Sequence, residues 1–328
     1  MATEIGYRAV HLEPSRRRQP GSGVCYRSRC RGLEQERARL MRSPRSGQSP
    51  PIITLLTDFG TRDPYVAAMR GAILSICPSA TLVDITHDVP PFEVAGGAYA
   101  LFGAYAEFPP GTVHLAVVDP GVGGARRPLA ARSRRYRFVG PDNGLLGLAL
   151  DREEGVEVRE LQNLRYRCNR VTPTFHGRDL FAPAAAWLAR GLPVGRLGRK
   201  ITAWAHSPLP LPGKTPGGSL RAAVLHIDRF GNVISNVRAD TLPRGWVRAG
   251  RLNCRARLAG RTVRRSETHF AAAPRGAPFL LINSLGFVEL ALRESSLARR
   301  WRVETGAPIT LQREPATGAA PLRAARGI

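Results

Sequence analysis

Lysine is nearly absent from this chain of 328 residues, although the chain is strongly basic. Only Lys200 and Lys214 are lysines, so arginine supplies almost all of the formal net charge of +24. The arginines are dispersed instead of interleaved with aromatic residues in one patch, as a nucleic-acid-binding surface would have them. We interpret the richness in Arg, Ala, Gly and Pro as a compositional bias of the genome. Specific binding to nucleic acid is therefore not predicted.

Long apolar runs and paired cysteines are also missing. No run reaches 18 apolar residues, and residues 1–30 contain no compact apolar segment of a secretory signal, so neither a membrane span nor export is predicted. The five cysteines form no CxxC pair, and Cys25 and Cys30 have no second pair that would complete a zinc site. We expect reduced thiols and a cytoplasmic protein.

The length of the chain predicts about two domains, and its 43% hydrophobic content is enough for a large core. Residues 1–50 contain eleven arginines with many Ser, Gly and Pro and no sustained period, which predicts disorder; Met41 is a plausible alternative start. The predicted organisation is a disordered extension (1–50), an α/β domain (51–205), a Pro/Gly-rich linker (206–218), a β domain (219–313) and a flexible tail (314–328).

Strands and helices are predicted to alternate in the first domain. The expected order is a strand at 52–58, a helix at 64–76, a strand at 81–85, a helix at 93–107 and a strand at 113–118. Asp63 and Asp179 are predicted to cap the helices at 64–76 and 180–190. This βαβαβ order predicts a mainly parallel sheet. The second domain has short runs separated by turns, which predict a small all-β barrel or sandwich: 220–227, 233–237, 251–256, 279–282 and 287–292.

The segment 116–127 is the most informative part of the chain. Asp119 ends a predicted buried strand, a glycine-rich loop follows, and Arg126 and Arg127 come directly after the loop. Open α/β sheets bind ligands at the carboxyl ends of their strands. The segment therefore predicts a site in which a carboxylate, backbone N–H groups and an arginine face a polar ligand.

Six polar clusters follow predicted strands or open a predicted helix: Thr57–Gly60, Val118–Gly123, Gly140–Gly144, Thr174–Asp179, Asp228–Asn232 and Asn283–Phe287. Any one of them could be an ordinary turn, because Asp, Asn and Gly favour turns. The glycines match neither the dinucleotide fingerprint nor a P-loop. Asp84, His87 and Asp88 could ligate a metal, which keeps a metal-dependent phosphohydrolase as an alternative.

Taken together, the first five of these clusters and the segment Asp84–Asp88 resemble the S-adenosyl-L-methionine hydroxide adenosyltransferase family, which is related to the fluorinating and chlorinating adenosyl enzymes. The resemblance extends over residues 52 to 312. It implies an N-terminal α/β domain, a C-terminal β-barrel and a homotrimer that binds S-adenosylmethionine between neighbouring subunits. The implied reaction is hydrolysis to adenosine and L-methionine. The substrate's sulfonium makes methionine a good leaving group, so no cofactor or metal is implied.

The resemblance also implies roles for individual residues. Asp119, Arg126 and His176 would handle the attacking water, with Arg127 as the alternative to Arg126. Halogenating relatives replace the Asp and His positions, so this chain favours hydroxide over halide. The other implied contacts are Asp58 to the ribose hydroxyls, Asp63 to the methionine amino group, Phe92 near the reacting carbon, Phe230 stacked on adenine, and polar contacts from Asp228, Asn232 and Ser284.

Leu285 stands at a position where halogenating members can carry an arginine. Three other functions remain as alternatives to the hydrolase: a halogenase of the same superfamily, the metal-dependent phosphohydrolase, and a basic nucleic-acid-binding protein.

Overall fold

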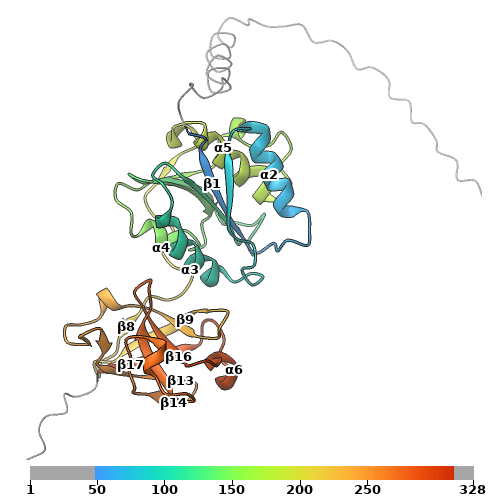
Figure 1. The fold of residues 1–328 in the computed structure, drawn as a ribbon. Coiled ribbons are helices and arrows are strands. Elements are labelled where there is room, and N and C mark those ends of the chain that lie inside the picture. Colours follow the sequence, from blue (N-terminus) through green and yellow to red (C-terminus); the bar gives the residue numbers. More distant parts are fainter. Residues whose placement is uncertain (1–48, 314–328) are drawn as a thin grey trace, which may run out of the picture. The chain divides into compact units, whose positions relative to one another are not determined.

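The computed structural model describes residues 49–313 and contains two large β-sheets (Figure 1). The predicted tail at 314–328 lies outside the described residues, and so does the predicted extension apart from its last two positions. Met41, Cys25 and Cys30 are outside them as well. Within residues 49–313, no helix has both the length and the apolar character needed to cross a membrane.

The first sheet has seven strands in the order β2-β1-β3-β5-β4-β6-β7. Its members are β1 (Ile52–Thr57), β2 (Thr81–Thr86), β3 (Val113–Val117), β4 (Pro128–Arg132), β5 (Arg137–Pro141), β6 (Glu157–Glu160) and β7 (Lys200–Ile201). The neighbours β2, β1, β3 and β5 run parallel, whereas β4, β6 and β7 each pair antiparallel. The predicted α/β class with a mainly parallel sheet is confirmed, and the antiparallel edge is an addition to it.

Helices cover both faces of this sheet: α2 (Tyr65–Ile76) and α5 (Ala182–Ala189) lie on one face, and α3 (Val94–Ala104) and α4 (Gly147–Leu150) lie on the other (Figure 1). The shorter turns are η1 (Tyr105–Glu107), η2 (Leu164–Tyr166), the π-helical η3 (Gly177–Phe181) and η4 (Val194–Arg196). α2 buries Val66, Met69 and Ile73, the apolar positions that its period of three to four residues predicts.

Both predicted helix caps are wrong. The N-cap of α2 is Pro64, and no side chain caps it, so Asp63 does not have the predicted role. Asp179 lies inside η3, before α5 begins. Its carboxylate accepts hydrogen bonds from the backbone N–H and the hydroxyl of Thr172, each at 2.7 Å, and from Arg178 at 2.6 Å. These partners occupy the oxygens that a capping aspartate would offer to the helix.

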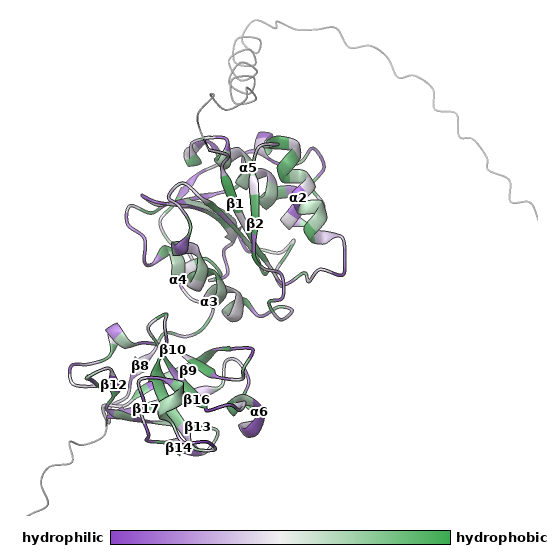
Figure 2. Ribbon diagram, in the orientation of Figure 1, coloured by the Kyte–Doolittle hydropathy of each residue, from purple (hydrophilic) through white to green (hydrophobic). Residues whose placement is uncertain are grey.

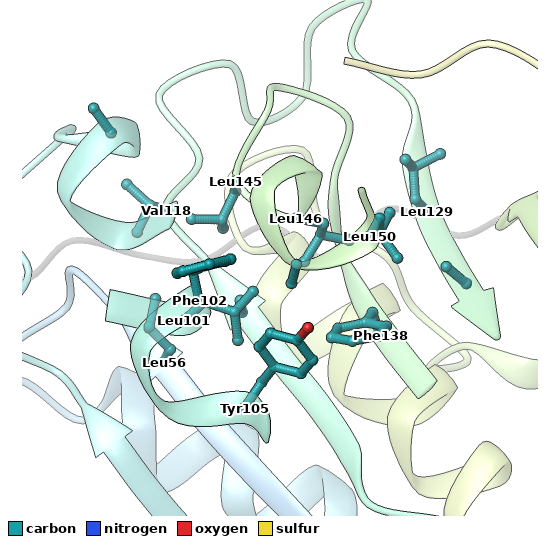
Figure 3. Close-up of a cluster of buried hydrophobic side chains, with 14 of the residues drawn as sticks. Leu56, Leu101, Phe102, Tyr105, Val118, Leu129, Phe138, Leu145, Leu146 and Leu150 are labelled. Carbon is teal, nitrogen blue, oxygen red and sulfur yellow. The ribbon is translucent and has the colours of Figure 1, made fainter. Parts of the chain in front are cut away.

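The hydrophobic colouring in Figure 2 follows strands such as β1. Between α3 and the sheet, Phe102 and Tyr105 point into a buried cluster with Phe138 (Figure 3), and the rings of Tyr105 and Phe138 are 5.6 Å apart. Burying each such side chain contributes about 1.5–3 kcal/mol. The same cluster includes Ile234 and Phe287 from the second sheet, so α3 contributes to a core shared by both sheets.

The second sheet has the order β14-β13-β17-β9-β10-β16-β15, and β8 pairs with β9 beside that path. Its strands are β8 (Gly213–Lys214), β9 (Leu220–Ile227), β10 (Val233–Arg238), β13 (Cys254–Leu258), β14 (Arg261–Val263), β15 (Pro278–Ile282), β16 (Phe287–Leu292) and β17 (Pro308–Arg313). The remaining elements are β11 (Val247–Arg248), β12 (Arg251–Leu252), η5 (Ala239–Thr241), η6 (Phe270–Ala272) and α6 (Leu297–Trp301). The predicted barrel-like fold is confirmed, and β8 lies within the segment predicted as a linker.

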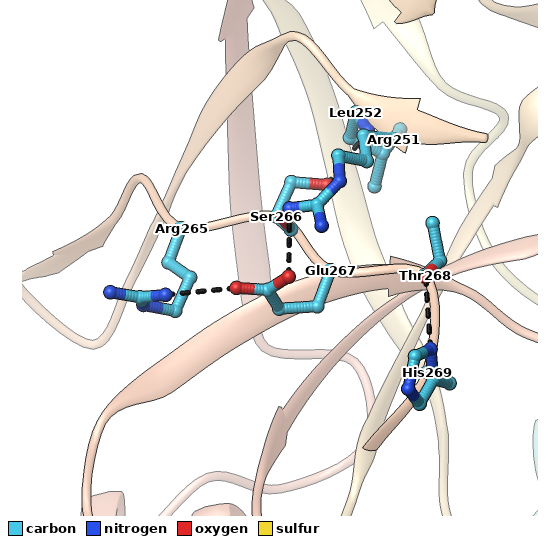
Figure 4. A network of polar contacts seen from close by, with 7 residues as sticks. All are labelled: Arg251, Leu252, Arg265, Ser266, Glu267, Thr268 and His269. Atoms are coloured by element: carbon cyan, nitrogen blue, oxygen red, sulfur yellow. Dashed lines mark hydrogen bonds and ion pairs between the residues drawn. The ribbon is translucent and has the colours of Figure 1, made fainter. Parts of the chain in front are cut away.

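The barrel is nearly closed by the segment 265–267, which lies along β15. The Leu280 N–H donates to the Arg265 carbonyl, and the Glu267 N–H donates to the Leu280 carbonyl, both at 2.8 Å. The Glu267 carboxylate accepts hydrogen bonds from Arg251 at 2.7 Å and from Arg265 at 2.8 Å (Figure 4). The hydrogen bond from Arg265 is the main reason that the pKa of Glu267 lies below its ordinary value. We call the segment 265–267 the barrel seam.

Candidate active site

The glycine-rich loop after β3 brings Arg126 back towards the end of that strand. Gly123 has a φ of +76°, and a Cβ atom there would lie 2.5 Å from the Pro173 carbonyl oxygen. Only glycine fits both the left-handed backbone and this close approach. The loop therefore lies against the segment that leads to His176, fifty residues further along the chain.

Asp119, Arg126 and His176 form one cluster. The Arg126 Nε–H donates to both Asp119 oxygens, at 2.8 and 3.0 Å, and Nη2 also contacts Asp119 Oδ2. The same Nη2 lies 2.7 Å from His176 Nδ1. The Arg126 and Asp119 side chains are 10% and 5% exposed, so bulk water hardly weakens their attraction. The Phe181 ring lies 5.3 Å from the Arg126 guanidinium carbon and supports it from η3.

The contact with Arg126 determines the protonation of His176. A guanidinium can only donate hydrogen bonds, so Nδ1 must accept, and the neutral imidazole carries its proton on Nε2. Burial, followed by the charge of Arg126, lowers the pKa of His176, while Asp119 and Asp179 act in the opposite direction. The ring is therefore neutral at pH 7, with Nε2–H left to donate to a ligand or to water.

Arg127 points to a different partner from its neighbour. Its Nε–H donates to Asp142 Oδ2 at 2.8 Å, and its Nη2 donates to the Ala203 carbonyl at 2.7 Å. Asn143 donates from Nδ2 to the Val118 carbonyl at 2.9 Å. The cluster Gly140–Gly144 thus braces the end of β3 and does not join Asp119, so Arg126, and not Arg127, is the arginine that contacts Asp119 and His176.

Asp58 follows β1 at the same edge of the sheet. Burial raises the pKa of Asp58, and the charge of nearby Asp119 adds to the rise, although a hydrogen bond from the Phe92 N–H opposes it. That N–H donates to Asp58 Oδ2 at 2.9 Å. Phe92 is 71% exposed, and Asp63 is also exposed. Asp58, Phe92 and Asp119 therefore belong to one region, while Asp63 has no contact with the cluster among the hydrogen bonds and ion pairs of residues 49–313.

The turn after β9 is built around Asp228. Its Oδ1 accepts from the N–H groups of Phe230 at 2.9 Å and Asn232 at 2.8 Å, and its Oδ2 accepts from Asn232 Nδ2 at 2.9 Å. Gly231 has a φ of +81°, and a Cβ there would collide with Ser296. This turn leaves the Phe230 ring 76% exposed.

Phe230 and Asn232 line a pocket of about 720 Å³, which is large enough for a small organic ligand. Every residue that lines it lies between 230 and 299, so this pocket belongs to the C-terminal β region alone. Phe270 and Arg299 also line it and offer a second aromatic ring and a positive charge.

Ser284 is exposed in the loop between β15 and β16, and its neighbour Asn283 orders that loop. Asn283 Oδ1 accepts from the N–H groups of Leu285 at 3.1 Å and Phe287 at 3.0 Å, and its Nδ2 donates to the Tyr99 hydroxyl at 3.1 Å. The Leu285 side chain lies against Gly103 of α3. Leu285 therefore packs between the two regions and presents no polar group to a ligand.

The alternative metal site lacks the required arrangement. No group of three or more His, Cys, Asp or Glu within residues 49–313 is placed to hold a metal ion. Asp84 is instead paired with Arg70 and with His87. Its carboxylate is therefore already engaged by cationic and ring N–H groups.

Two family models match the chain: the SAM hydroxide adenosyltransferase N-terminal domain over residues 53–198 and the corresponding C-terminal domain over residues 222–310. The chain belongs to the SAM hydroxide adenosyltransferase family. A relative from Thermus thermophilus named (R)-S-adenosyl-L-methionine hydrolase is 39% identical over 267 residues, with 79% of this chain and 98% of the relative aligned. A relative from Salinispora arenicola with the same name is 38% identical, with 79% and 96% aligned.

The family also includes halogenating relatives. A protein from an Actinoplanes species named fluorinase is 29% identical over 290 residues, with 80% of this chain and 97% of that protein aligned. Among solved structures, an uncharacterized conserved protein from Thermotoga maritima superposes with a TM-score of 0.69 at 33% identity and covers 80% of this chain and 100% of its own.

The structure brings some of the predicted residues together and adds others. Asp119, Arg126 and His176 meet, and Asp58 and Phe92 meet, whereas Phe230, Asn232 and Asp228 share a separate turn. Sequence reasoning missed Phe181, and it named Asn283 only as part of the cluster Asn283–Phe287 without assigning it a role. The sequence held no clear signal for Phe181, because its contact with Arg126 depends on the π-helical turn at Gly177–Phe181.

Proposed function

We propose that this member of the SAM hydroxide adenosyltransferase family hydrolyses S-adenosyl-L-methionine to adenosine and L-methionine. The contact of Arg126 with both Asp119 and His176 carries the proposal, because it concentrates three polar groups at one strand end. The hydrolase names of relatives at 37–43% identity support the activity. An aspartate and a histidine at this cluster favour water over halide as the nucleophile.

The reaction is an in-line displacement at the ribose C5′. The water oxygen forms a bond to C5′, the C5′–S bond breaks, and its electron pair stays on the sulfur, which becomes the neutral thioether of methionine. The sulfonium is a good leaving group, so the enzyme mainly has to position a water molecule and take up its proton. Placing reactants in near-attack geometry can contribute about 7–11 kcal/mol in favourable cases.

The cluster suggests a division of work between its three residues. His176 Nδ1 is engaged by Arg126, so the Nε2–H donates a hydrogen bond to the water oxygen and holds it in line. Asp119 has lone pairs left after its hydrogen bonds with Arg126, and one of them accepts the proton of the water. Arg126 fixes the orientation of both.

The substrate contacts divide between the two regions of the chain. Asp58 binds the ribose hydroxyls, Phe92 lies near C5′, and Asp63 binds the methionine amino group. Phe230 stacks on adenine, and Asp228, Asn232 and Ser284 complete the polar contacts, with Asp228 and Asn232 acting mainly by shaping the turn that carries Phe230.

The enzyme is proposed to be a homotrimer whose substrate lies between subunits. Two large aromatic side chains, Phe92 and Phe230, are more than two-thirds exposed, so both rings are open to a ligand or to a neighbouring subunit. A neighbouring subunit would bring its α/β region to the pocket beside Phe230. The domain limits 51–205 and 219–313, the cytoplasmic location and the independence from cofactors and metals are part of the same proposal.

The test is to incubate the purified protein with S-adenosylmethionine, with and without EDTA and with and without chloride, and to separate the products by chromatography. Adenosine and methionine in equal amounts, unaffected by EDTA, are expected. 5′-Chloroadenosine would identify a halogenase, and activity lost in EDTA would favour the metal-dependent phosphohydrolase. Absence of any product, together with salt-dependent binding to DNA or RNA, would contradict the proposal in favour of a nucleic-acid-binding protein.

A further inference from the structure

A chain of polar contacts runs beneath Asp58 and uses residues to which the proposed reaction assigns no role. The Thr57 hydroxyl lies 2.8 Å from His87 Nδ1. His87 Nε2 lies 3.1 Å from Asp84 Oδ1, off the line of an ideal hydrogen bond, and Asp84 is also paired with Arg70. Thr57 is fully buried and His87 is 5% exposed, so neither can contact a ligand from this position.

The direction of these contacts follows from their chemistry. The Phe59 N–H donates to the Thr57 oxygen at 3.2 Å, and the Thr57 hydroxyl can in turn donate its proton to His87 Nδ1. When Nδ1 accepts in this way, the ring proton lies on Nε2, on the side of Asp84. Burial alone would raise the pKa of Asp84, but hydrogen bonds from Arg70 and His87 bring it below its ordinary value, so the carboxylate stays ionised. The negative charge of Asp84 beside Nε2 thus favours the His87 tautomer whose Nδ1 can accept from Thr57.

The same residues join two loops. The Gly60 N–H donates to the His87 carbonyl at 2.8 Å, next to the contact between the Thr57 and His87 side chains. The Phe92 N–H donates to Asp58 Oδ2 at 2.9 Å. The loop after β1 and the loop after β2 are therefore connected on both sides of Asp58.

Phe92 needs such support. Its φ is +69°, in the left-handed region that a bulky residue rarely adopts, and its side chain is 71% exposed. An exposed ring gains little from packing, so the surrounding hydrogen bonds must hold the strained backbone. The hydrogen bond to Asp58 is the one that reaches the Phe92 N–H, and the position of Asp58 depends on the loop that Thr57 and His87 anchor.

We propose that Thr57, His87 and Asp84 are positioning residues that hold Asp58 and Phe92 in the geometry that binds the substrate. The identity of that substrate rests on the proposed function, but the mechanical coupling does not. Hydroxyl, histidine and carboxylate follow one another here as in a catalytic Ser-His-Asp triad. The Thr57 hydroxyl is buried, however, so it holds the loop and does not attack a substrate.

The chain contains a matched control on the same strand. Thr54 in β1 is also fully buried, and its hydroxyl lies 2.9 Å from His114 Nδ1. Thr54→Val and Thr57→Val each remove one buried contact between a threonine and a histidine; Thr57→Val also removes the hydrogen bond from the Phe59 N–H, and only Thr57 is connected to the Asp58 loop. Thr57→Ser restores the hydroxyl without the methyl group.

The first readout is amide hydrogen exchange, which needs no substrate. Thr57→Val should accelerate exchange at Gly60 and Phe92 by about fivefold or more, as expected when a net hydrogen-bond contribution is lost. Thr54→Val should leave these two amides unchanged, and Thr57→Ser should restore wild-type exchange. Equal exchange at Phe92 in the two valine variants would overturn the proposal.

The second readout is steady-state kinetics with S-adenosylmethionine. Thr57→Val should raise KM about fivefold with kcat changed less than twofold, while Thr54→Val matches the wild type and Thr57→Ser recovers the wild-type KM. A KM that is the same in both valine variants would overturn the proposal. If the wild-type protein does not turn over the substrate, the proposed function fails, and the exchange measurement still decides the coupling.

Asp84→Asn provides a milder variant in case Thr57→Val does not fold. The Asp84 side chain is 37% exposed, so this isosteric change should not prevent folding. It should accelerate exchange at Phe92 by about threefold, since an amide holds the His87 ring more weakly than a carboxylate. Unchanged exchange at Phe92 in this variant would also count against the proposal.

Discussion

Asp119 follows a strand of the first sheet, in the N-terminal region, and Asp228 follows a strand of the second sheet, in the C-terminal region. The two carboxylates are held in opposite ways. Asp119 is fixed by the side chain of Arg126, 7 residues further along the chain, and Arg126 in turn contacts His176, 50 residues beyond it. Asp228 is fixed by its own turn, within four residues. The Asp119 cluster thus brings polar groups together from distant parts of the chain, whereas the Asp228 turn is local and presents an exposed aromatic ring. Substitutions in the Asp119 cluster should change kcat, and substitutions in the Asp228 turn or of Phe230 should change KM.

The largest effect is expected for Asp119→Ala and His176→Ala. Each should lower kcat about 100-fold or more with little change in KM, because the groups that orient the water and take its proton are lost. Steady-state rates of adenosine release provide the measurement, and thermal unfolding checks that the variants are folded. Near-normal turnover in either variant would contradict the division between the two regions.

A smaller fall in kcat is expected when the branched guanidinium of Arg126 is replaced by another positively charged group. In Arg126→Lys a single ammonium cannot contact Asp119 and His176 at once, so kcat should fall about tenfold or more. Arg127→Lys is the matched control, since Arg127 pairs with Asp142, and kcat should stay within about threefold of the wild type. If the two variants lose equal activity, the contacts of the Arg126 guanidinium with Asp119 and His176 are not needed for turnover.

In the C-terminal region, Phe230→Ala tests whether the exposed ring binds adenine. Loss of stacking on one base costs about 1–3 kcal/mol, so KM should rise about tenfold while kcat stays within twofold. Phe230→Trp keeps a stacking surface and should retain a KM near that of the wild type. A fall in kcat without a change in KM would show that Phe230 acts in turnover and not in substrate binding.

Glu289→Gln should have the smallest effect on activity, because this substitution changes the free energy of unfolding and not the proposed site. Glu289 is buried on β16 near Tyr99 of α3, and burial raises its pKa to about 7, with the charge of Asp228 contributing. The folded state therefore keeps a proton that the unfolded state releases near pH 4.5, and the wild type loses stability as pH rises through this window.

Glu289→Gln should abolish that loss. The variant should be more stable than the wild type by about 2–3 kcal/mol at pH 8 and by less than about 1 kcal/mol at pH 5. Urea unfolding at the two pH values measures the difference. An advantage that is the same at both pH values would show that Glu289 does not titrate between them.

The fold was largely predictable where the hydrophobic period is local and regular. The strands at 52–57, 81–86 and 113–117 and the helix at 65–76 lie close to the predicted segments. β17 was not predicted as a separate strand, although it pairs with both β9 and β13 inside the second sheet, because its alternation is short and rests on two apolar residues, Ile309 and Leu311.

The candidate site was predictable in its residue types but not in its geometry. The spacing along the chain does not decide between Arg126 and Arg127, since the backbone of the Gly123 loop determines which side chain faces Asp119. The role of Asp179 was mistaken for the same reason. A capping aspartate and one bound by Thr172 have the same sequence signature, and only the tertiary contact distinguishes them.

The barrel seam has a consequence for the way the C-terminal region comes apart. A sheet that closes through a short segment has fewer cross-links there than along its full-length strand pairs, so local opening should begin at 265–267. Arg251 and Arg265 hold the segment through the ionised Glu267, whose protonation in acid would release both arginines. Acid should therefore expose this segment to proteases before the rest of the barrel unfolds, so limited proteolysis at low pH should cut first within the barrel seam.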